Sequence, residues 1–154
     1  MKRFPLAALV LLGCLTATVT AGPLQLGGRA FDDQFDRSLS IGPAVKTLVF
    51  APDRAAGKIA SAYLNGQLGQ SLEARGIRYL ADISGMPGLI NKLFAIPAMQ
   101  DYGYPVLLGR QAAQTADLPR REGEVSVLRL QDGEVTAVAY AADAEALAAL
   151  LPED

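Results

Sequence analysis

The sequence predicts a single α/β domain built on a mixed central sheet. An apolar strand at 46–51 is followed by an amphipathic helix and a second strand at 77–83, which is the order of a βαβ unit. Two further strand-like segments, 125–130 and 135–140, flank an Asp-Gly dipeptide and precede a last helix. The chain has 154 residues, 51% of them hydrophobic and 19% charged, which is typical of one globular domain.

A buried strand and a long helix open the βαβ unit. Residues 46–51 (KTLVFA) form an apolar run between two prolines, which favours a buried strand. Asp53 is placed to cap the following helix, because its carboxylate can accept from the free amides of the first turn. The helix is expected to run to about Arg75, where Gly76 can end it in a left-handed conformation. Its buried face is an i+4 row of four residues: Ala60, Leu64, Leu68 and Leu72.

Three glycines weaken this predicted helix. Gly57, Gly66 and Gly69 each destabilise a helix by about 1 kcal/mol relative to alanine. Close packing of the helix against the sheet is the expected reason that they are tolerated.

The middle of the chain is predicted to hold a strand, a helix and a third extended segment. Residues 77–83 (IRYLADI) form the strand, and a turn at 84–87 leads into the helix, which Pro97 should cut short. Residues 104–108 are expected to be extended, and 111–118 to form a short helix. The apolar face of the first helix combines two i+4 pairs: Leu89 with Leu93, and Ile90 with Phe94.

The end of the chain predicts a β-hairpin and a helix. Asp132-Gly133 suits a two-residue type I′ turn, because both positions of that turn need positive φ. Asp143 is placed to cap the last helix. The buried side of that helix should carry three leucines: Leu147, Leu150 and Leu151.

Before the first predicted strand, residues 22–40 form a polar lead-in with a possible short strand at 24–26. Three carboxylates, Asp32, Asp33 and Asp36, could hold a cation, but they lack the regular spacing of a calcium loop. We therefore expect this segment to be a solvated approach to the fold.

The order of elements over residues 44–151 resembles the thioredoxin fold, a three-layer sandwich around a mixed sheet. The 104–108 segment (YPVLL) is similar to the insertion found in peroxiredoxins and in exported thioredoxin-like proteins. The sequence segments at 81–87 (ADISGMP) and 96–99 (IPAM) resemble segments of small uncharacterised periplasmic thioredoxin-like proteins. This resemblance rests on the order of elements and not on a catalytic motif.

The chain departs from that resemblance where the thiol chemistry would lie. Thioredoxin-like oxidoreductases carry Cys-x-x-Cys at the start of the first long helix, where the helix dipole lowers the pKa of the attacking thiol. Here the matching residues 50–57 read FAPDRAAG, without sulfur. The family pattern also has a proline, often cis, directly before the first hairpin strand. Here residues 122–124 (EGE) stand there, and the nearest proline is Pro119.

The residue inventory excludes several mechanisms. The one cysteine is Cys14 and there is no histidine, so the folded domain acting alone cannot be a thiol peroxidase, disulfide isomerase, thiol reductase or Ser-His-Asp hydrolase. Neither a dinucleotide-binding nor a P-loop glycine motif occurs. The formal net charge is −2 and the basic residues are scattered, which argues against nucleic-acid binding. No cofactor and no metal is predicted.

The first residues have the layout of a secretory signal peptide. Lys2 and Arg3 precede an apolar run over 6–15, and small residues end in Val-Thr-Ala at 19–21. The apolar run is too short for a membrane span. We therefore expect residues 1–21 to be a signal peptide, residues 22–154 to be the domain, and the protein to be periplasmic.

Cys14 leaves a second reading of this segment open. Residues 11–14 (LLGC) resemble a lipobox, in which the cysteine would be acylated and become the first mature residue. The residues that follow are apolar and do not form a polar tether, so cleavage after Ala21 is the preferred reading. Either way, no thiol remains in the folded domain.

Two segments are candidates for a binding surface. One is the start of the first helix and the other is the loop after the second strand, and both should fall at the carboxyl edge of the sheet, where ligands bind in open α/β folds. The candidate residues are Pro52, Asp53, Arg54, Asp82, Ser84, Met86 and Pro87.

The sequence favours a non-catalytic periplasmic binding module that is redox-inactive by itself. Its partner would be an unidentified periplasmic protein or small ligand. The alternative is an enzyme, or a subunit of one, that relies on a bound cofactor or on the thiol of a partner.

Overall fold

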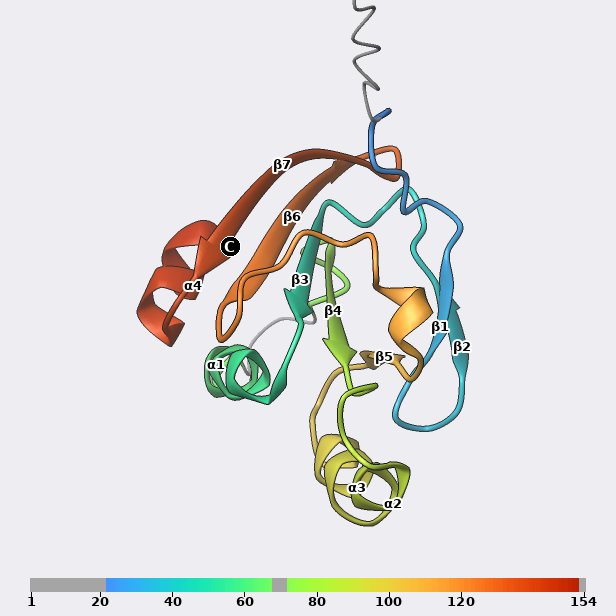
Figure 1. Ribbon diagram of the computed structural model, residues 1–154. Coiled ribbons are helices and arrows are strands. Elements are labelled where there is room, and N and C mark those ends of the chain that lie inside the picture. Colours follow the sequence, from blue (N-terminus) through green and yellow to red (C-terminus); the bar gives the residue numbers. More distant parts are fainter. Residues whose placement is uncertain (1–21, 68–71, 153–154) are drawn as a thin grey trace, which may run out of the picture.

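A seven-stranded sheet with the order β2-β1-β5-β4-β3-β6-β7 organises the protein (Figure 1). The structure, a computed structural model, describes residues 22–67 and 72–152. The predicted signal peptide with Cys14, and Leu68 and Gly69 of the predicted helix, lie outside the described residues. The strands are β1 (Ala30–Asp32), β2 (Ser38–Ser40), β3 (Thr47–Ala51), β4 (Ile77–Asp82), β5 (Val106–Gly109), β6 (Val125–Gln131) and β7 (Glu134–Ala141).

The predicted mixed sheet is confirmed. Strands β3, β4 and β5 are parallel neighbours, whereas β6 pairs antiparallel with β3, and β7 pairs antiparallel with β6. The helices are α1 (Arg54–Leu64), α2 (Gly88–Ile90), the π-helix η1 (Asn91–Ala95), α3 (Ile96–Gln100), the 3₁₀-helix η2 (Ala112–Gln114) and α4 (Ala144–Leu150).

Side chains of the central strands alternate between two apolar cores, one on each face of the sheet. On β3, Val49 points to the face covered by α1, α3 and α4, whereas Leu48 and Phe50 point to the opposite face. The opposite face is covered by the lead-in and by the segment after β5, which contribute Leu26 and Leu118. The protein therefore has three layers, with helices on one face and mostly non-helical chain on the other.

Helix α1 is shorter than the sequence predicts. It ends at Leu64 and not near Arg75, so the predicted C-terminal part of the helix is wrong. Ala60 and Leu64 of the predicted apolar row are buried on α1, and Leu72 is buried outside it. Gly66 follows the last turn closely, and a glycine there favours the end of a helix.

Gly76 has the left-handed conformation that the sequence predicts, with φ of +69°, but it ends a separate turn. The amide of Ile77 donates to the carbonyl of Leu72 at 2.8 Å, and the amide of Gly76 donates to that of Glu73 at 3.0 Å. This pair of bonds is a Schellman motif, which directs the chain into β4.

Replacing Gly76 with alanine is expected to destabilise the protein by about 1–2 kcal/mol. A Cβ at this position would lie 3.0 Å from the carbonyl oxygen of Ala44, in addition to the unfavourable φ. Urea unfolding measures the change. Gly42→Ala is the control, because that position has open space and an ordinary φ; equal effects of the two substitutions would contradict the prediction.

The predicted helix after 84–87 does not end at Pro97. Residues 88–100 form three consecutive helical segments, and Pro97 lies in the first turn of α3. The amide of Ile96 donates to the carbonyl of Asn91, five residues back, so the turn before the proline is wider than an α-turn. This wider turn accommodates the proline, which would clash with a carbonyl inside a regular α-helix.

The lead-in forms a hairpin that the sequence does not predict, because β1 and β2 are only three residues each. The expectation of a solvated approach is wrong for Asp33, which is fully buried and accepts from the amides of Phe35 and Arg37. Burial alone would raise the pKa of Asp33, but the hydrogen bonds from Arg37 and Phe35 outweigh it and hold that pKa below its usual value. Asp36 pairs with Arg110 at 2.7 Å.

Buried Gln34 joins this hairpin to the far end of the helical segment. Its side-chain amide donates to the carbonyls of Met99 and Tyr104, and its side-chain oxygen accepts from the amide of Val106 at 2.8 Å. The possible strand at 24–26 is reduced to one bridge, between Gln25 and Glu134.

The C-terminal hairpin and helix agree with the prediction. Asp132 and Gly133 have φ of +50° and +82°, as a type I′ turn requires. The carboxylate of Asp143 accepts from the amide of Ala146 at 2.7 Å and caps α4, whose Leu147 is fully buried. The predicted helix at 111–118 is limited to the single turn η2.

No helix in the described part of the chain is long and apolar enough to cross a membrane.

Candidate functional site

A cleft of about 600 Å³ opens between α1 and the helical segment 88–100. The cleft is lined by the C-terminal part of β4 and by the start of α1. The cleft therefore lies at the carboxyl edge of the sheet, where the sequence predicts a binding site. The residues that line it are Asp53, Arg54, Gly57, Lys58, Ser61, Tyr79, Ala81, Asp82, Ile83, Met86, Ile90, Phe94, Ala95, Ala98, Met99 and Tyr102.

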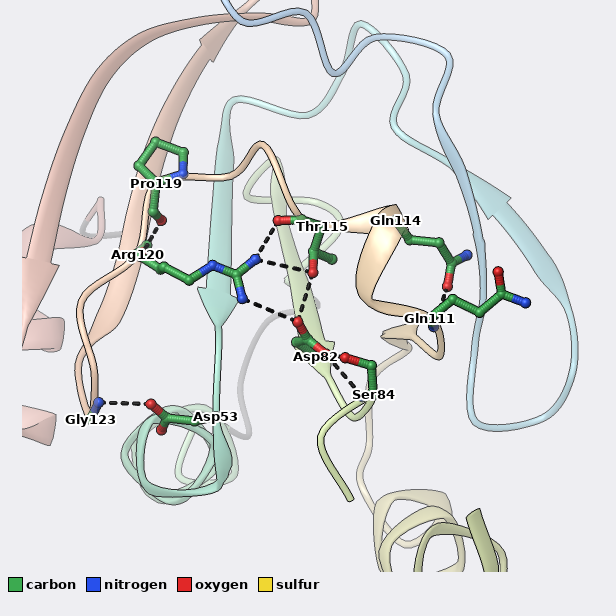
Figure 2. A network of polar contacts seen from close by, with 10 residues as sticks. Asp53, Asp82, Ser84, Gln111, Gln114, Thr115, Pro119, Arg120 and Gly123 are labelled. Atoms are coloured by element: carbon green, nitrogen blue, oxygen red, sulfur yellow. Dashed lines mark hydrogen bonds and ion pairs between the residues drawn. The ribbon is translucent and has the colours of Figure 1, made fainter. Parts of the chain in front are cut away.

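Asp53 ties the start of α1 to the loop before β6. One carboxylate oxygen accepts from the amide of Ala56 at 2.9 Å, which is the predicted N-cap. The other accepts from the amide of Gly123 at 2.7 Å (Figure 2). Asp53 therefore links the start of α1 to the loop before β6 and satisfies a backbone amide at each, at the two positions that the sequence resemblance matches to the thiols and the proline of thioredoxin-like oxidoreductases.

Asp82, the last residue of β4, is the centre of a polar network (Figure 2). One carboxylate oxygen accepts from the amide of Ser84 at 2.9 Å and from its hydroxyl at 2.6 Å. The other accepts from the hydroxyl of Thr115 at 2.7 Å and from the guanidinium of Arg120 at 3.3 Å. Arg120 also donates to the carbonyl of Thr115 and lies 5.2 Å from the ring centre of Phe50. The network joins three segments that are distant in the sequence.

This network keeps Asp82 ionised. Its side chain is 6% exposed, and burial alone would raise the pKa of its carboxyl. The hydrogen bonds from Ser84, Thr115 and Arg120 outweigh burial and hold that pKa below its usual value. A carboxylate with all these donors has little capacity left to accept from a ligand.

Unlike the two carboxylates, the two cations of the cleft have no partner among the described residues. Arg54 and Lys58 lie one turn apart on α1, and neither makes an ion pair within residues 22–67 and 72–152. Arg54 and Lys58 are therefore the charged side chains of the cleft lining that have no partner in the described part of the protein.

The structure brings most of the predicted surface residues together. Asp53, Arg54, Asp82 and Met86 line the cleft. Ser84 belongs to the Asp82 network behind it. Pro52 and Pro87 flank the site without lining it: Pro52 precedes the Asp53 cap, and Pro87 begins the helical segment. Whether these residues bind a partner stays a prediction.

The sequence placed Tyr102 and Tyr104 near this edge of the sheet, but it did not mark Tyr79, which forms the floor of the cleft. Tyr79 lies on β4 and is 2% exposed, and its ring contacts that of Tyr104 edge-on at 6.3 Å. Tyr102 lines the cleft and stacks against Tyr104 at 5.5 Å. Burial, with the neighbouring Tyr104 and Tyr102, raises the pKa of Tyr79, so its hydroxyl stays protonated. In the sequence Tyr79 is an ordinary strand residue, and nothing marks it as part of a site.

The described residues offer no group of three or more His, Cys, Asp or Glu side chains that could hold a metal ion. Asp33 and Asp36 of the lead-in, and Asp53 and Asp82 of the cleft, are instead engaged by arginines, hydroxyls and backbone amides.

Comparison with known proteins supports the fold and nothing finer. No protein-family profile matches the sequence, and no curated protein matches it. Among solved structures, the chain is similar to peroxidoxin BcpB from Mycobacterium tuberculosis, with 16% identity and a TM-score of 0.52 over 82% of this chain and 93% of that one.

Two further solved structures share the architecture. A candidate protein disulfide isomerase from Bacteroides thetaiotaomicron has a TM-score of 0.53 at 10% identity, over 82% of each chain. A candidate thiol:disulfide interchange protein DsbE from Chlorobium tepidum has a TM-score of 0.50 at 10% identity, over 82% of this chain and 91% of that one. The mixed sheet and its covering helices therefore form a thioredoxin-like fold, in a chain whose one cysteine cannot supply the catalytic pair.

Proposed function

We propose that the protein is a non-catalytic binding module of the periplasm, without redox activity of its own, and that it binds through the cleft beside α1. The observation that carries this proposal is the double hydrogen bond of Asp53 to Ala56 and Gly123. Asp53 makes this structural contact at the helix start where thioredoxin-like oxidoreductases carry their thiols. An open cleft of about 600 Å³ remains next to it.

The periplasmic part of the proposal rests on the first 21 residues. A basic start, an apolar run and small residues before Ala21 favour export and cleavage. In the same reading the mature chain has no cysteine at all, which suits a module that works without thiol exchange.

Charge reversal at Arg54 is expected to remove the bound partner or ligand without unfolding the protein. Arg54 is exposed at the mouth of the cleft and has no partner in the described chain, so Arg54→Glu breaks no internal contact. Native mass spectrometry of protein purified gently from its host envelope should show bound material on the wild type and none on the variant. Lys92→Glu is the matched control, because Lys92 is an exposed cation outside the cleft lining.

The same experiment can overturn the proposal. Bound material that remains on Arg54→Glu would remove the cleft as the binding surface. A tightly held cofactor on both proteins would favour the enzyme alternative. The purified protein should also leave the dithiothreitol-driven reduction of a disulfide-bonded test substrate unchanged, and acceleration of that reaction would contradict the absence of redox activity.

A further inference from the structure

One face of α1 presents both unpaired cations of the cleft. Arg54, Gly57, Lys58 and Ser61 have the spacing i, i+3, i+4 and i+7, and all four line the cleft. Gly57 therefore lies between the two cations and leaves a gap in this face. The gap is the entrance to the floor of the cleft.

The hydroxyl of Tyr79 lies beneath that gap. A Cβ placed on Gly57 would be 3.7 Å from the hydroxyl oxygen, and Tyr79 as a whole is 2% exposed. The hydroxyl makes no hydrogen bond to any described residue. The hydroxyl is not among the fully buried unpaired atoms, although the side chain as a whole is buried, so it is available to a ligand in the cleft.

Packing does not explain why position 57 is glycine. At 3.7 Å the added methyl group of an alanine would make an ordinary contact, so the expected reason, close packing against the sheet, is wrong at this position. Glycine destabilises a helix relative to alanine. What it provides here is an open path to the Tyr79 hydroxyl.

The opposite wall of the cleft is apolar. Met86, Ile90, Phe94 and Met99 line it, and Phe94 is 64% exposed at the mouth. The volume of about 600 Å³ falls within the range of about 300–1,000 Å³ typical of small-molecule sites. The cleft thus combines an apolar wall with a small polar face.

The polar groups of the cleft that have no partner among the residues described are donors. Asp53 and Asp82, the two carboxylates in the cleft lining, already accept from protein donors. Arg54, Lys58 and Tyr79 keep free N–H and O–H groups. A ligand that matches this face carries a negative charge and accepts hydrogen bonds.

Resting on the proposed function, we infer that the cleft binds a small amphipathic carboxylate. Its carboxylate lies against α1, where Arg54 and Lys58 neutralise it and the hydroxyl of Tyr79 donates through the gap at Gly57. Its apolar chain lies along Met86, Ile90, Phe94 and Met99. A carboxylate is preferred because its two oxygens can accept from a guanidinium and a hydroxyl together.

Decanoate is a suitable probe, compared with decanol and decyltrimethylammonium below their micelle concentrations. Isothermal titration calorimetry on residues 22–154 should show saturable binding of decanoate and no comparable binding of the cationic analogue. Decanol should bind about tenfold or more weakly, because it lacks the charge-assisted hydrogen bonds. Equal affinities for decanoate and decanol would overturn the role of the cations.

Three variants test the individual groups. Arg54→Gln and Tyr79→Phe should each weaken decanoate binding by about tenfold, whereas Lys92→Gln should leave it unchanged. Gly57→Ala should raise the urea midpoint of unfolding and still weaken binding, because its methyl group covers the Tyr79 hydroxyl. Tyr79→Phe should not lower the urea midpoint of unfolding, because the hydroxyl has no partner in the described chain. Unchanged binding by Tyr79→Phe and Gly57→Ala would overturn the inferred polar contact.

The test separates this inference from the proposed function. If decanoate does not bind, but envelope material is lost from Arg54→Glu, the cleft is a binding surface and the amphipathic carboxylate is wrong. If envelope material of peptide nature occupies the cleft, the inference fails in the same way. If neither decanoate nor envelope material binds, both proposals fail.

Discussion

Replacing Asp82 with alanine is expected to destabilise the protein by about 3 kcal/mol. The carboxylate is 6% exposed and accepts from Ser84, Thr115 and Arg120, so its loss removes the partners of several donors at once. Urea unfolding followed by circular dichroism measures the change. Ser84→Ala and Thr115→Val each remove one hydroxyl donor and should destabilise the protein by about 1 kcal/mol.

The same carboxylate gives a pH dependence of defined sign. The pKa of Asp82 is lowered in the folded protein from an ordinary value of 3.8, so its contribution is complete above that value. The contribution is lost as the pH falls through the lowered folded pKa. Asp82→Asn should therefore lose less stability than the wild type when acidified from neutral pH, and parallel pH profiles would contradict the assignment.

Replacing Asp53 with alanine is expected to destabilise the protein by about 2 kcal/mol. The substitution removes the N-cap of α1 and leaves the amide of Gly123 without its acceptor. Urea unfolding again gives the magnitude. Because Gly123 precedes β6, hydrogen exchange of that loop should also accelerate.

Asp143→Ala is the matched control for Asp53. Asp143 caps α4 through the amide of Ala146 and has no second acceptor role in the described chain, so its loss should destabilise the protein by about 1 kcal/mol. Asp53→Asn keeps one oxygen for the cap but presents an amide group at the other end, and should give an intermediate result. Equal effects of Asp53→Ala and Asp143→Ala would show that the bond to Gly123 contributes nothing.

The two aspartates connect segments that are distant in the sequence. Asp53 ties the start of α1 to the loop before β6, and Asp82 ties the end of β4 to Thr115 and Arg120. Both accept from backbone or side-chain donors at the carboxyl edge of the sheet. In the cleft beside them, Arg54, Lys58 and the Tyr79 hydroxyl have no partner in the described chain.

Local sequence signals predicted the elements whose causes are local. The apolar run of β3, the caps Asp53 and Asp143, and the Asp132-Gly133 turn all depend on a few adjacent residues, and the structure contains them. The edge of the sheet at which the cleft lies also followed from the order of elements. The absence of a cysteine pair and of histidine was evident from composition alone.

The errors arise where distant contacts decide the outcome. The sequence predicts that Pro97 ends the helix, but the π-turn before it accommodates the proline ring. The sequence predicts that Asp33 is solvated, but the hydrogen bonds from Arg37 and from two backbone amides make its burial favourable. The short strand β1 exists because β5 and β2 lie on either side of it, and such a segment is too short to carry a periodic signal.

The sequence by itself determined the α/β class, the main helix caps and the lack of a catalytic cysteine pair and of histidine, because these depend on residue type and short-range pattern. Only the tertiary structure decided which donors remain free. Asp53 and Asp82 are engaged by Gly123, Thr115 and Arg120, which lie far away in the sequence. The Tyr79 hydroxyl is available because Gly57 of another element leaves it uncovered, and such a juxtaposition is created by folding and not by local sequence.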